Sequence, residues 1–443
     1  MERHPDAERP AMTPYGAVAE GAWGWVLEQV RWDDDVPWIP ESAGGERQTE
    51  YADGMHSGLG GLAHTLAEIK LTRPWTDDEQ HLASAIANRI RSTIPTEASV
   101  TYFDGLPSGI GVLTALGEPG SAAAVERALE LATGDGWHES YLENEEKYRP
   151  GAVANDATLG TAGVLMCALW ALRHGEAARP LADRAADHLL AEQEETPSGL
   201  NWLFVPRRFV LDPPVEMPNF SHGLAGIAAV LATAGVELGR PELVTAAQRG
   251  AEHLVTLGIN DDKGFRVPRV IPWAERHGDE YTYNWCHGGP GTSLLFTALD
   301  YAGVKQVAGE STMTWHRRCL DSVRSSGVPE RIHPGFWDND GRCCGTAGVG
   351  DVCLDSWHRN GDEQDLEFAV RLADALVERA IHDGPSAYWR FIEYRNDEPL
   401  LPPGVGWMQG AAGIAAYLFR IERVLGGDQR AIERMDNWWA LRR

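Results

Sequence analysis

A short glycine pattern recurs along the chain, and each copy is followed by an apolar run of helical length. The pattern is Gly-x-x-Gly, with one extra residue in the second copy, and its last glycine recurs 48 to 65 residues apart. After Gly226, for example, the chain reads Ile-Ala-Ala-Val-Leu. A helix that is apolar on all sides is typical of a buried, inner position. The seven copies end at Gly61, Gly109, Gly163, Gly226, Gly291, Gly348 and Gly413.

The segments between the copies are amphipathic with the period of a helix. Over residues 365–380, apolar side chains gather on one helical face and charged side chains on the other. A second such segment starts at Pro241, and proline is favoured in the first turn of a helix. Its apolar face holds Leu243, Ala246, Ala247 and Leu254. We interpret these segments as outer helices, which are buried on one side only.

The alternation predicts an all-α fold, a double α-toroid of about seven helical hairpins with an inner ring inside an outer ring. A closed ring buries the apolar faces that an open stack leaves at its ends. One domain is expected over residues 15–443, after a disordered N-terminal tail over residues 1–14. The glycine loops then lie at one end, and the inner helix N-termini give the cavity there a positive dipole character. Two irregular stretches, 201–219 and 264–283, are predicted as hairpins over its mouth.

The charge balance narrows the range of partners. The chain has 39 Lys and Arg against 65 Asp and Glu, a formal net charge of −26. Such a surface repels phosphate backbones and anionic lipid, so no nucleic acid and no membrane surface is expected as a partner. No apolar stretch reaches the roughly 18 residues of a membrane span, and the first residues lack an apolar signal region. We therefore expect a cytoplasmic protein without membrane insertion.

The cysteines indicate metal chemistry. In a reducing compartment, clustered cysteines argue for metal binding or catalysis rather than for disulfides. The repeat places His222, Cys286 with His287, and Cys343 with Cys344 at the first glycine of copies four, five and six, at the same end of the predicted ring. Zinc favours thiolate and imidazole ligands, and a catalytic zinc site keeps three protein ligands and one open position. The three cysteines supply that number.

These elements resemble the lanthionine synthetase C-like family. The segment Asn284-Trp-Cys-His-Gly-Gly-Pro-Gly291 is similar to that family's Trp-Cys-(Tyr/His)-Gly-x-Pro-Gly element, and Arg342-Cys-Cys-Gly-Thr-Ala-Gly348 is similar to its second metal element. Residues 221–226 look like its histidine loop, and residues 155–163 look like the loop with its active-site Asp. The resemblance implies a double α-toroid with acid–base chemistry at His222, supported by Asp156. It also implies a Zn²⁺ ion held by Cys286, Cys343 and Cys344.

One position departs from the family pattern. The commoner second element is Cys-His-Gly, whereas Cys344 stands in place of the histidine here. Three thiolates leave a zinc site with one more negative charge than two thiolates and an imidazole. The ion is then a poorer Lewis acid, but a bound substrate thiolate is more nucleophilic, so we expect a reactive and permissive enzyme. His287, next to a ligand, is a candidate for assisting proton transfer.

The resemblance implies a zinc-dependent lanthipeptide cyclase. In the family's cyclases, a Cys thiol of a precursor peptide adds to dehydroalanine or dehydrobutyrine and forms a thioether ring. The expected partner is a dehydrated precursor peptide, leader plus core. Dehydration is then expected from a separate dehydratase or kinase/lyase protein.

Alternative functions stay open at this point. The enzyme could instead add glutathione or another thiol to dehydroamino acids. A non-catalytic scaffold would use zinc structurally, with four protein ligands. A toroidal zinc prenyltransferase subunit also activates thiols, but the glycine repeat and the segment 285–288 argue against it.

Single residues also have structural readings. Asp156 is a favoured helix cap, and His222 and His287 could serve packing alone. We expect Cys167, Cys319 and Cys353 in the core, and His56 and His333 in loops or at the surface. Asp351 and Asp355, four apart on the sixth inner helix, form a weak signal for a carboxylate pair.

Overall fold

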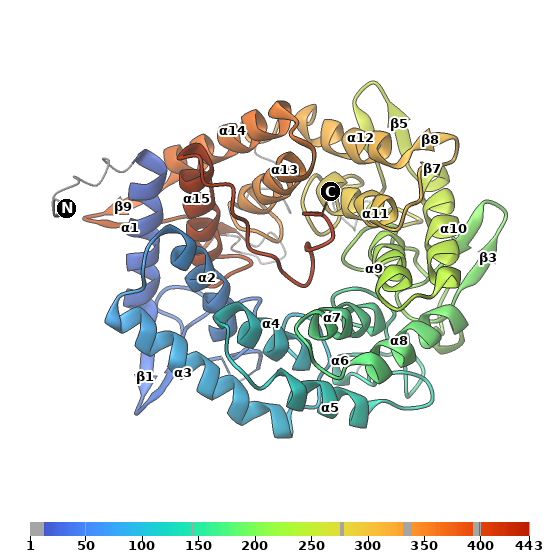
Figure 1. Cartoon of the computed structure of the whole chain (residues 1–443), viewed down its shortest axis with the longest axis horizontal. Coiled ribbons are helices and arrows are strands. Elements are labelled where there is room, and N and C mark those ends of the chain that lie inside the picture. The colour runs from blue at the N-terminus through green and yellow to red at the C-terminus, as the bar shows by residue number, and fades with distance from the viewer. Residues whose placement is uncertain are drawn as a thin grey trace, which may run out of the picture.

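Helices alternate between two concentric rings in the computed structural model, which describes residues 13–48, 50–143, 145–274, 279–330, 339–392, 398 and 400–442 (Figure 1). The inner ring consists of α2 (Leu62–Thr72), α4 (Leu106–Leu116), α7 (Thr161–Arg173), α9 (Leu224–Glu237), α11 (Gly289–Tyr301), α13 (Thr346–Asn360) and α15 (Ala411–Leu425). The outer ring consists of α1 (Pro14–Gln29), α3 (Asp77–Thr93), α5 (Ser121–Leu131), α8 (Arg179–Ala191), α10 (Pro241–Leu257), α12 (Thr312–Arg324) and α14 (Glu363–Arg379). A one-turn helix, α6 (Ser140–Glu143), lies in a loop. The predicted double α-toroid is confirmed. Residues 1–12 of the predicted tail lie outside the described residues.

Burial separates the two rings as the hydrophobic pattern predicts. In α9, every residue from Leu224 to Gly235 is buried. In α10, which packs on α9, the buried residues are confined to one face. Its buried face includes Leu243, Ala246, Ala247 and Leu254. None of the described helices is long and apolar enough to cross a membrane.

The glycine pattern exists because a loop backbone passes against the start of each inner helix. A Cβ atom on Gly223 would lie 1.5 Å from the carbonyl oxygen of Met217, six residues earlier. A Cβ on Gly226 would lie 1.9 Å from the carbonyl oxygen of Phe220, again six residues earlier. Most other copies repeat this approach. Both glycines are therefore required by space, not by a left-handed backbone.

The same loops satisfy the free amides of the first helical turn. In α7, the backbone N–H groups of Thr161 and Ala162 donate to the carbonyl oxygens of Ala154 and Asn155, at 2.9 and 3.0 Å. The corresponding amides of α9 and α15 donate to carbonyls seven residues earlier in the same way. These N–H groups would otherwise be unpaired. Because the loops take them, these amides are not available to bind a ligand.

A methyl group at the second glycine of the pattern should destabilise the fold. We expect Gly413→Ala to lower the free energy of unfolding by about 1–3 kcal/mol through overpacking, because its Cβ would lie 1.8 Å from the carbonyl oxygen of Trp407. Gly24→Ala in α1 is the matched control, since nothing lies within 4 Å of a Cβ there. That change should raise the free energy of unfolding by roughly 0.5–1 kcal/mol. Urea unfolding of both variants checks the pair, and equal shifts would contradict the steric explanation.

The β structure consists of short antiparallel hairpins, and the predicted positions of two of them are wrong. Residues 202–219 are irregular apart from a 3-10 turn and isolated β-bridges, and the hairpin ends at Asn201. Within 264–283, only the first three residues form a strand, and it pairs with a strand that precedes it in the chain. Residues 275–278 lie outside the described residues. The hairpins are β1 (Arg31–Asp33)–β2 (Val36–Trp38), β3 (Glu194–Thr196)–β4 (Gly199–Asn201), β5 (Ile259–Asp261)–β6 (Gly264–Arg266), β7 (Gln306–Val307)–β8 (Glu310–Ser311), β9 (Ile381–Asp383)–β10 (Ser386–Tyr388) and β11 (Phe391–Ile392)–β12 (Leu400–Leu401).

The two irregular stretches pair with each other instead. Glu216 and Ile271 exchange two backbone hydrogen bonds of 2.8 Å. The physical reason for the misplacement is that a two-residue turn directly after an outer helix, as between β3 and β4, needs few β-forming residues. The hairpins therefore form at these short turns and not in the residues of higher β-propensity that follow them.

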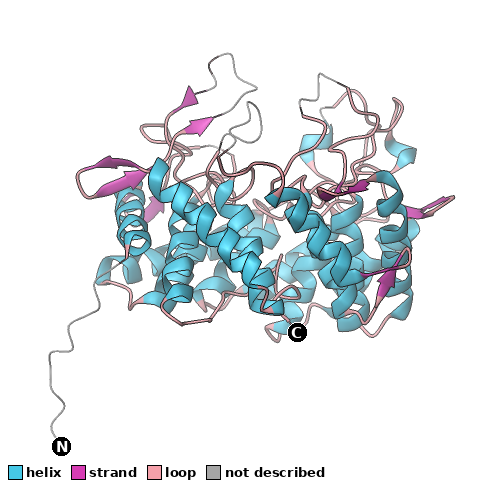
Figure 2. Ribbon diagram, turned by 90° about the horizontal axis from the view of Figure 1, so that it is seen from above, coloured by secondary structure: helices cyan, strands magenta, loops and turns pink. Residues whose placement is uncertain are grey.

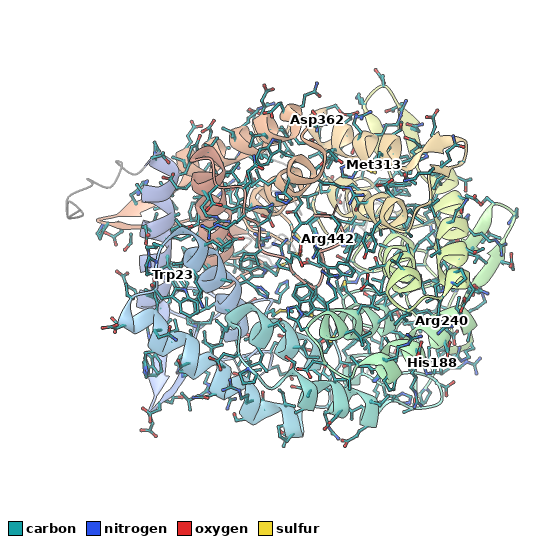
Figure 3. The ribbon with its side chains drawn as sticks, viewed as in Figure 1. Trp23, His188, Arg240, Met313, Asp362 and Arg442 are labelled. Atoms are coloured by element: carbon teal, nitrogen blue, oxygen red, sulfur yellow. The ribbon has the colours of Figure 1, made fainter. Side chains whose placement is uncertain are left out.

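The first and last long helices close the ring. The Glu422 carboxylate of α15 accepts a hydrogen bond from the backbone N–H of Gly16, in the first turn of α1, at 3.2 Å. After α15 the chain turns into the axis of the toroid, where Arg442 lies near the centre of the ring (Figure 3). Trp438 and Trp439 are fully buried there. This C-terminal segment lies at the end of the toroid away from the loop-rich end (Figure 2).

Candidate active site

The candidate side chains come from four successive loops, each directly before an inner helix. Asp156 precedes α7 and His222 precedes α9; Cys286 and His287 precede α11, and Cys343 and Cys344 precede α13. These helices are neighbours in the inner ring. Their loops contact one another: Thr158 Oγ1 donates to the carbonyl oxygen of Ser221, and the N–H of Ser221 donates to that of Cys286. Cys286 Sγ in turn lies 3.5 Å from Cys344 Sγ. The structure thus brings together all six predicted residues.

Three cysteines form a tight cluster in these loops. The Sγ atoms of Cys286, Cys343 and Cys344 all lie within 4.8 Å of one another. The distance from Cys344 Sγ is 3.5 Å to each of the other two sulfurs. Cys286 is buried, with 4% exposed, and the other two are half-buried. The cluster is therefore partly exposed, through Cys343 and Cys344.

His222 and Asp156 form a hydrogen-bonded pair beside the cluster. His222 Nδ1 lies 2.9 Å from Asp156 Oδ2, and Thr158 Oγ1 donates to the same carboxylate oxygen at 3.0 Å. The Asp156 side chain is fully buried, whereas that of His222 is 29% exposed. The histidine is thus held by a buried carboxylate, while part of its side chain remains exposed.

Asp156 also caps its own loop, as asparagines do in the next two copies. Its Oδ1 atom accepts from the backbone N–H of Leu159 at 3.0 Å. In the following copies, Asn219 accepts from the N–H of His222 and Asn284 from that of His287, both at 2.9 Å. All three residues stand seven positions before the second glycine. A carboxylate at this position therefore caps with one oxygen and binds His222 with the other.

His287 completes the histidine side of the site. Its ring centroid lies 5.4 Å from that of His222, and 8% of the residue is exposed. Burial, together with the charges of His222 and Arg269, holds the pKa of His287 well below its usual range. His287 is therefore a neutral imidazole at neutral pH.

The matching family model decides the identity of the chain. A model of the lanthionine synthetase C-like protein family matches residues 49–424. The chain belongs to this family. Comparison with curated protein sequences finds no match.

Two solved structures place the fold of this lanthionine synthetase C-like chain. Nisin cyclase matches with a TM-score of 0.61 and 16% sequence identity, over 96% of this chain and 96% of its own. A family 76 glycoside hydrolase from a bovine Bacteroides thetaiotaomicron strain matches with a TM-score of 0.50 and 13% identity, over 94% of this chain and 78% of its own. At these identities the likeness concerns the toroid alone.

The cysteine cluster fits the zinc ion that membership in the lanthionine synthetase C-like family implies. Sulfur ligands at about 2.3 Å from a tetrahedral ion lie about 3.8 Å apart, close to the 3.5 Å between Cys344 Sγ and its two neighbours. The donor set is soft and thiol-only, which zinc accepts. Among the described residues, no fourth His, Cys, Asp or Glu joins the group.

Zinc loading should release about two protons near neutral pH, because thiols must deprotonate to bind a metal. Burial and hydrogen bonds with the other two thiols hold the pKa of Cys286 well above its usual range. For Cys344, a hydrogen bond with Cys286 lowers the pKa. The hydrogen bond with Cys343 and burial together raise it by more, so the pKa of Cys344 also lies well above its usual range. The pKa of Cys343 is low because both neighbours hydrogen-bond to it. The pKa is thus raised for two of the thiols and lowered for the third.

The apparent zinc affinity should consequently rise with pH, by up to about 10²-fold per pH unit while both thiols remain protonated. Calorimetric titrations between pH 6 and 8, in buffers of different ionisation enthalpy, measure both the slope and the number of protons. A pH-independent affinity would contradict the protonation states inferred for the cluster.

The other predicted residues have structural roles in the described chain. Cys167, Cys319 and Cys353 are fully buried in the core, as expected. Asp351 and Asp355 are buried too, but arginines bind them. Arg420 lies 2.7 Å from Asp351 and 2.6 Å from Asp355, and Arg434 of the C-terminal segment lies 2.9 Å from Asp351. His333 lies outside the described residues.

Proposed function

We propose that this chain is a zinc-dependent lanthipeptide cyclase, which adds a Cys thiol of a dehydrated precursor peptide to dehydroalanine or dehydrobutyrine. The observation that carries the proposal is the cluster of three thiols beside the His222–Asp156 pair. Family membership and the toroid shared with nisin cyclase support it. The reaction needs activation of the substrate thiol and a proton donor. Zinc held by the cysteine cluster would supply the first, and His222 the second.

Three protein ligands favour a catalytic over a structural metal. Structural zinc sites use four protein ligands, whereas catalytic sites leave one position for water or substrate. Within the described residues, only Cys286, Cys343 and Cys344 group closely enough to share an ion. When bound, zinc would supply the means to deprotonate an incoming thiol, of which only a few per cent is thiolate at neutral pH. This argues for the enzyme and against the scaffold.

His222 is proposed as the proton donor. Attack of the sulfur on the β-carbon of the dehydroamino acid places negative charge on the adjacent carbonyl. A protonated His222 can stabilise that charge and then protonate the α-carbon, a contribution typically worth about 10²–10⁴-fold. Its Nδ1–H donates to Asp156, which fixes the ring so that Nε2 is free to act. Neutral His287, beside it, can pass a proton but carries no charge of its own.

The surroundings of His222 suit a peptide. The Phe204 ring stands edge-on to the His222 ring, with centroids 6.0 Å apart. Phe204 also lines a cavity of about 580 Å³, together with Leu203, Val205 and Met217. The lining is mainly apolar, with Lys147 and Asp212 as its charged members. We propose that apolar side chains of the peptide bind in this cavity while its Cys reaches the thiol cluster.

A free-thiol assay tests the proposal. A peptide with one Cys and one dehydroalanine is incubated with zinc-loaded protein, alkylated and weighed by mass spectrometry. Cyclisation leaves the mass unchanged and removes the alkylation site. A parallel reaction with added glutathione distinguishes the alternative, since addition of glutathione raises the mass and leaves the peptide thiol free. Thiol loss no faster than without protein would overturn the cyclase proposal.

A further inference from the structure

The apolar cavity of about 580 Å³ beside His222 is tied to the loop that carries Asp156. Asn155, the residue before Asp156, is buried. Its backbone N–H donates to the carbonyl oxygen of Phe204 at 2.8 Å, and its Nδ2 donates to that of Leu203 at 2.9 Å. Both acceptors belong to residues that line the cavity. The cavity wall and the carboxylate that holds His222 are therefore positioned by consecutive residues.

A small hydrophobic cluster of its own supports this cavity. The cluster is separate from the main core of the toroid, and such satellite clusters form under long loops. Its buried members are Leu142, Ala152, Ala154 and Val205. Tyr148, Phe204 and Val210, which line the cavity, pack against it. Part of the lining is thus packed in place before any ligand binds, as in most ligand sites.

Apolar side chains also stand exposed around the cavity. Val215 lines the cavity and is 38% exposed. Leu211 and Trp273, each adjacent in sequence to a lining residue, are 55% and 41% exposed. Exposed apolar side chains that gather in one place mark interaction sites, and the volume lies within the roughly 300–1,000 Å³ of ligand pockets. The cavity and this apolar rim have the features of a binding site.

The cavity lies on the His222 flank of the site. Its lining comes from the connections before α7 and α9, apart from Pro272, which is brought in by the backbone pairing of Ile271 with Glu216. The cysteine cluster comes from the loops directly before α11 and α13. The Phe204 ring centroid is 6.0 Å from that of His222. Along the inner ring, the order is therefore apolar cavity, His222, thiol cluster (Figure 1).

We propose that the apolar cavity binds the peptide residue next to the dehydroamino acid, on the side away from the Cys, and selects a large apolar side chain there. This inference rests on the proposed function, in which the sulfur lies at the thiol cluster and the α-carbon at His222. The next Cα atom is about 3.8 Å along the peptide, so its side chain can reach the Phe204 ring. The peptide on the other side of the dehydroamino acid returns toward the thiols.

Charged side chains are poor occupants of this cavity. The charged members of the lining, Lys147 and Asp212, have opposite signs, and both are exposed. Lys147 also lies 3.3 Å from the Glu145 carboxylate. A charged peptide side chain would lose hydration there without gaining a buried counter-charge from the described lining, which is unfavourable. An apolar side chain gains from leaving water, so Leu and Phe are the expected occupants.

Peptides that differ at one position test the proposal. Each has one Cys and one dehydroalanine, with Leu or Gly next to the dehydroalanine on the side away from the Cys. With zinc-loaded protein, kcat/KM for the Leu peptide should be about 10–10²-fold higher, mainly through KM, because burial of one Leu side chain has an effect of this size. A third peptide, with Gly at this position and Leu on the far side of the Cys, should behave like the Gly peptide.

A filled cavity should remove the preference. In Val215→Trp, the larger side chain occupies the cavity from its exposed rim, so the advantage of the Leu peptide should shrink to a few-fold. Val236→Trp is the matched control, because Val236 is 41% exposed near the end of α9 and does not line the cavity. The control should keep the wild-type preference. Both valines are partly exposed, so neither change should overpack the core.

Binding of unreactive peptides separates this proposal from the cyclase proposal. Labelled peptides with Ala in place of dehydroalanine and Ser in place of Cys cannot react, and fluorescence anisotropy measures their Kd. The Leu peptide should bind at least about 10-fold more tightly than the Gly peptide. If this difference exists but no thioether forms, the cyclase proposal fails and the subsite stands. If thioethers form with equal kcat/KM for both peptides, the subsite fails and the cyclase stands.

Two further results would overturn the subsite. One is an advantage of Leu that is as large on the far side of the Cys, or that Val215→Trp leaves unchanged. The other is a dimer of this chain in sedimentation that Val215→Trp dissociates, because the apolar rim would then bind a second copy and not the peptide.

Discussion

Cys344→Ala is expected to lose zinc and thioether formation together. Residues that merely support a metal ligand typically cost 10–100-fold in metal affinity, so removal of a ligand should cost more than about 10²-fold. The two remaining sulfurs, of Cys286 and Cys343, leave an ion with too few protein ligands. Cyclisation should then fall to the rate without enzyme, because the substrate thiol stays mostly protonated at neutral pH. Metal analysis after dialysis and the free-thiol assay check both effects.

Cys353→Ala is the matched control for this prediction. Cys353 is buried in α13, the helix that follows the Cys344 loop, but it lies outside the thiol cluster. The control should lose some stability and keep zinc at one ion per chain. Zinc retained at this stoichiometry by Cys344→Ala would mean that the three-thiol site is not the metal site.

His222→Asn is expected to keep zinc and lose most of its activity. Removal of a proton donor of this kind lowers kcat by about 10²–10⁴-fold. Thiol peptide should still bind, because His222 is not part of the thiol cluster, so the loss should appear in kcat rather than in KM. Rapid-quench kinetics with mass spectrometry measure the rate of ring formation. A higher KM with an unchanged kcat would contradict a role of His222 in the proton step.

Asp156→Asn separates the two roles of this carboxylate. The neighbouring loops use asparagine for the same backbone cap, so the loop should keep its fold. An amide cannot accept from both Leu159 and His222 through its two ends, because one end is a donor. The ring of His222 then loses its fixed tautomer, and kcat should fall by about 10²-fold or more. Unchanged kcat would leave Asp156 as a cap alone.

Buried ion pairs, and not the candidate catalytic residues, anchor the loop that carries Cys343 and Cys344. Arg342 precedes the metal loop and lies 2.5 Å from Asp351, which also binds Arg434 of the C-terminal segment. The Arg342 guanidinium stacks on the Trp407 ring at 4.1 Å. Buried ion pairs of this kind are costly to break because an uncompensated charge remains. Arg434 of the C-terminal segment therefore helps to hold the cysteine loop in place, through Asp351.

The sequence alone determined the architecture and the composition of the cysteine cluster. Gly-x-x-Gly and the helical period are local signals that repeat with each hairpin, so they predicted which helices are buried on all sides. Residues at the same register of a repeat lie at the same end of a closed ring. That rule was enough to bring Cys286, Cys343 and Cys344 together from positions far apart in the chain.

The tertiary structure decided what depends on contacts between different copies. The bond between Asp156 and His222 joins two loops, and the carbonyl oxygen of His56 accepts from the N–H of Met408 because α15 and α2 are adjacent once the ring closes. Closure packs α15 against α1 and α2, and Glu422 accepts a hydrogen bond from the start of α1. No local pattern encodes such distances, since each depends on the size and closure of the whole ring. The repeat therefore fixed the register of each side chain, and ring closure fixed its partners.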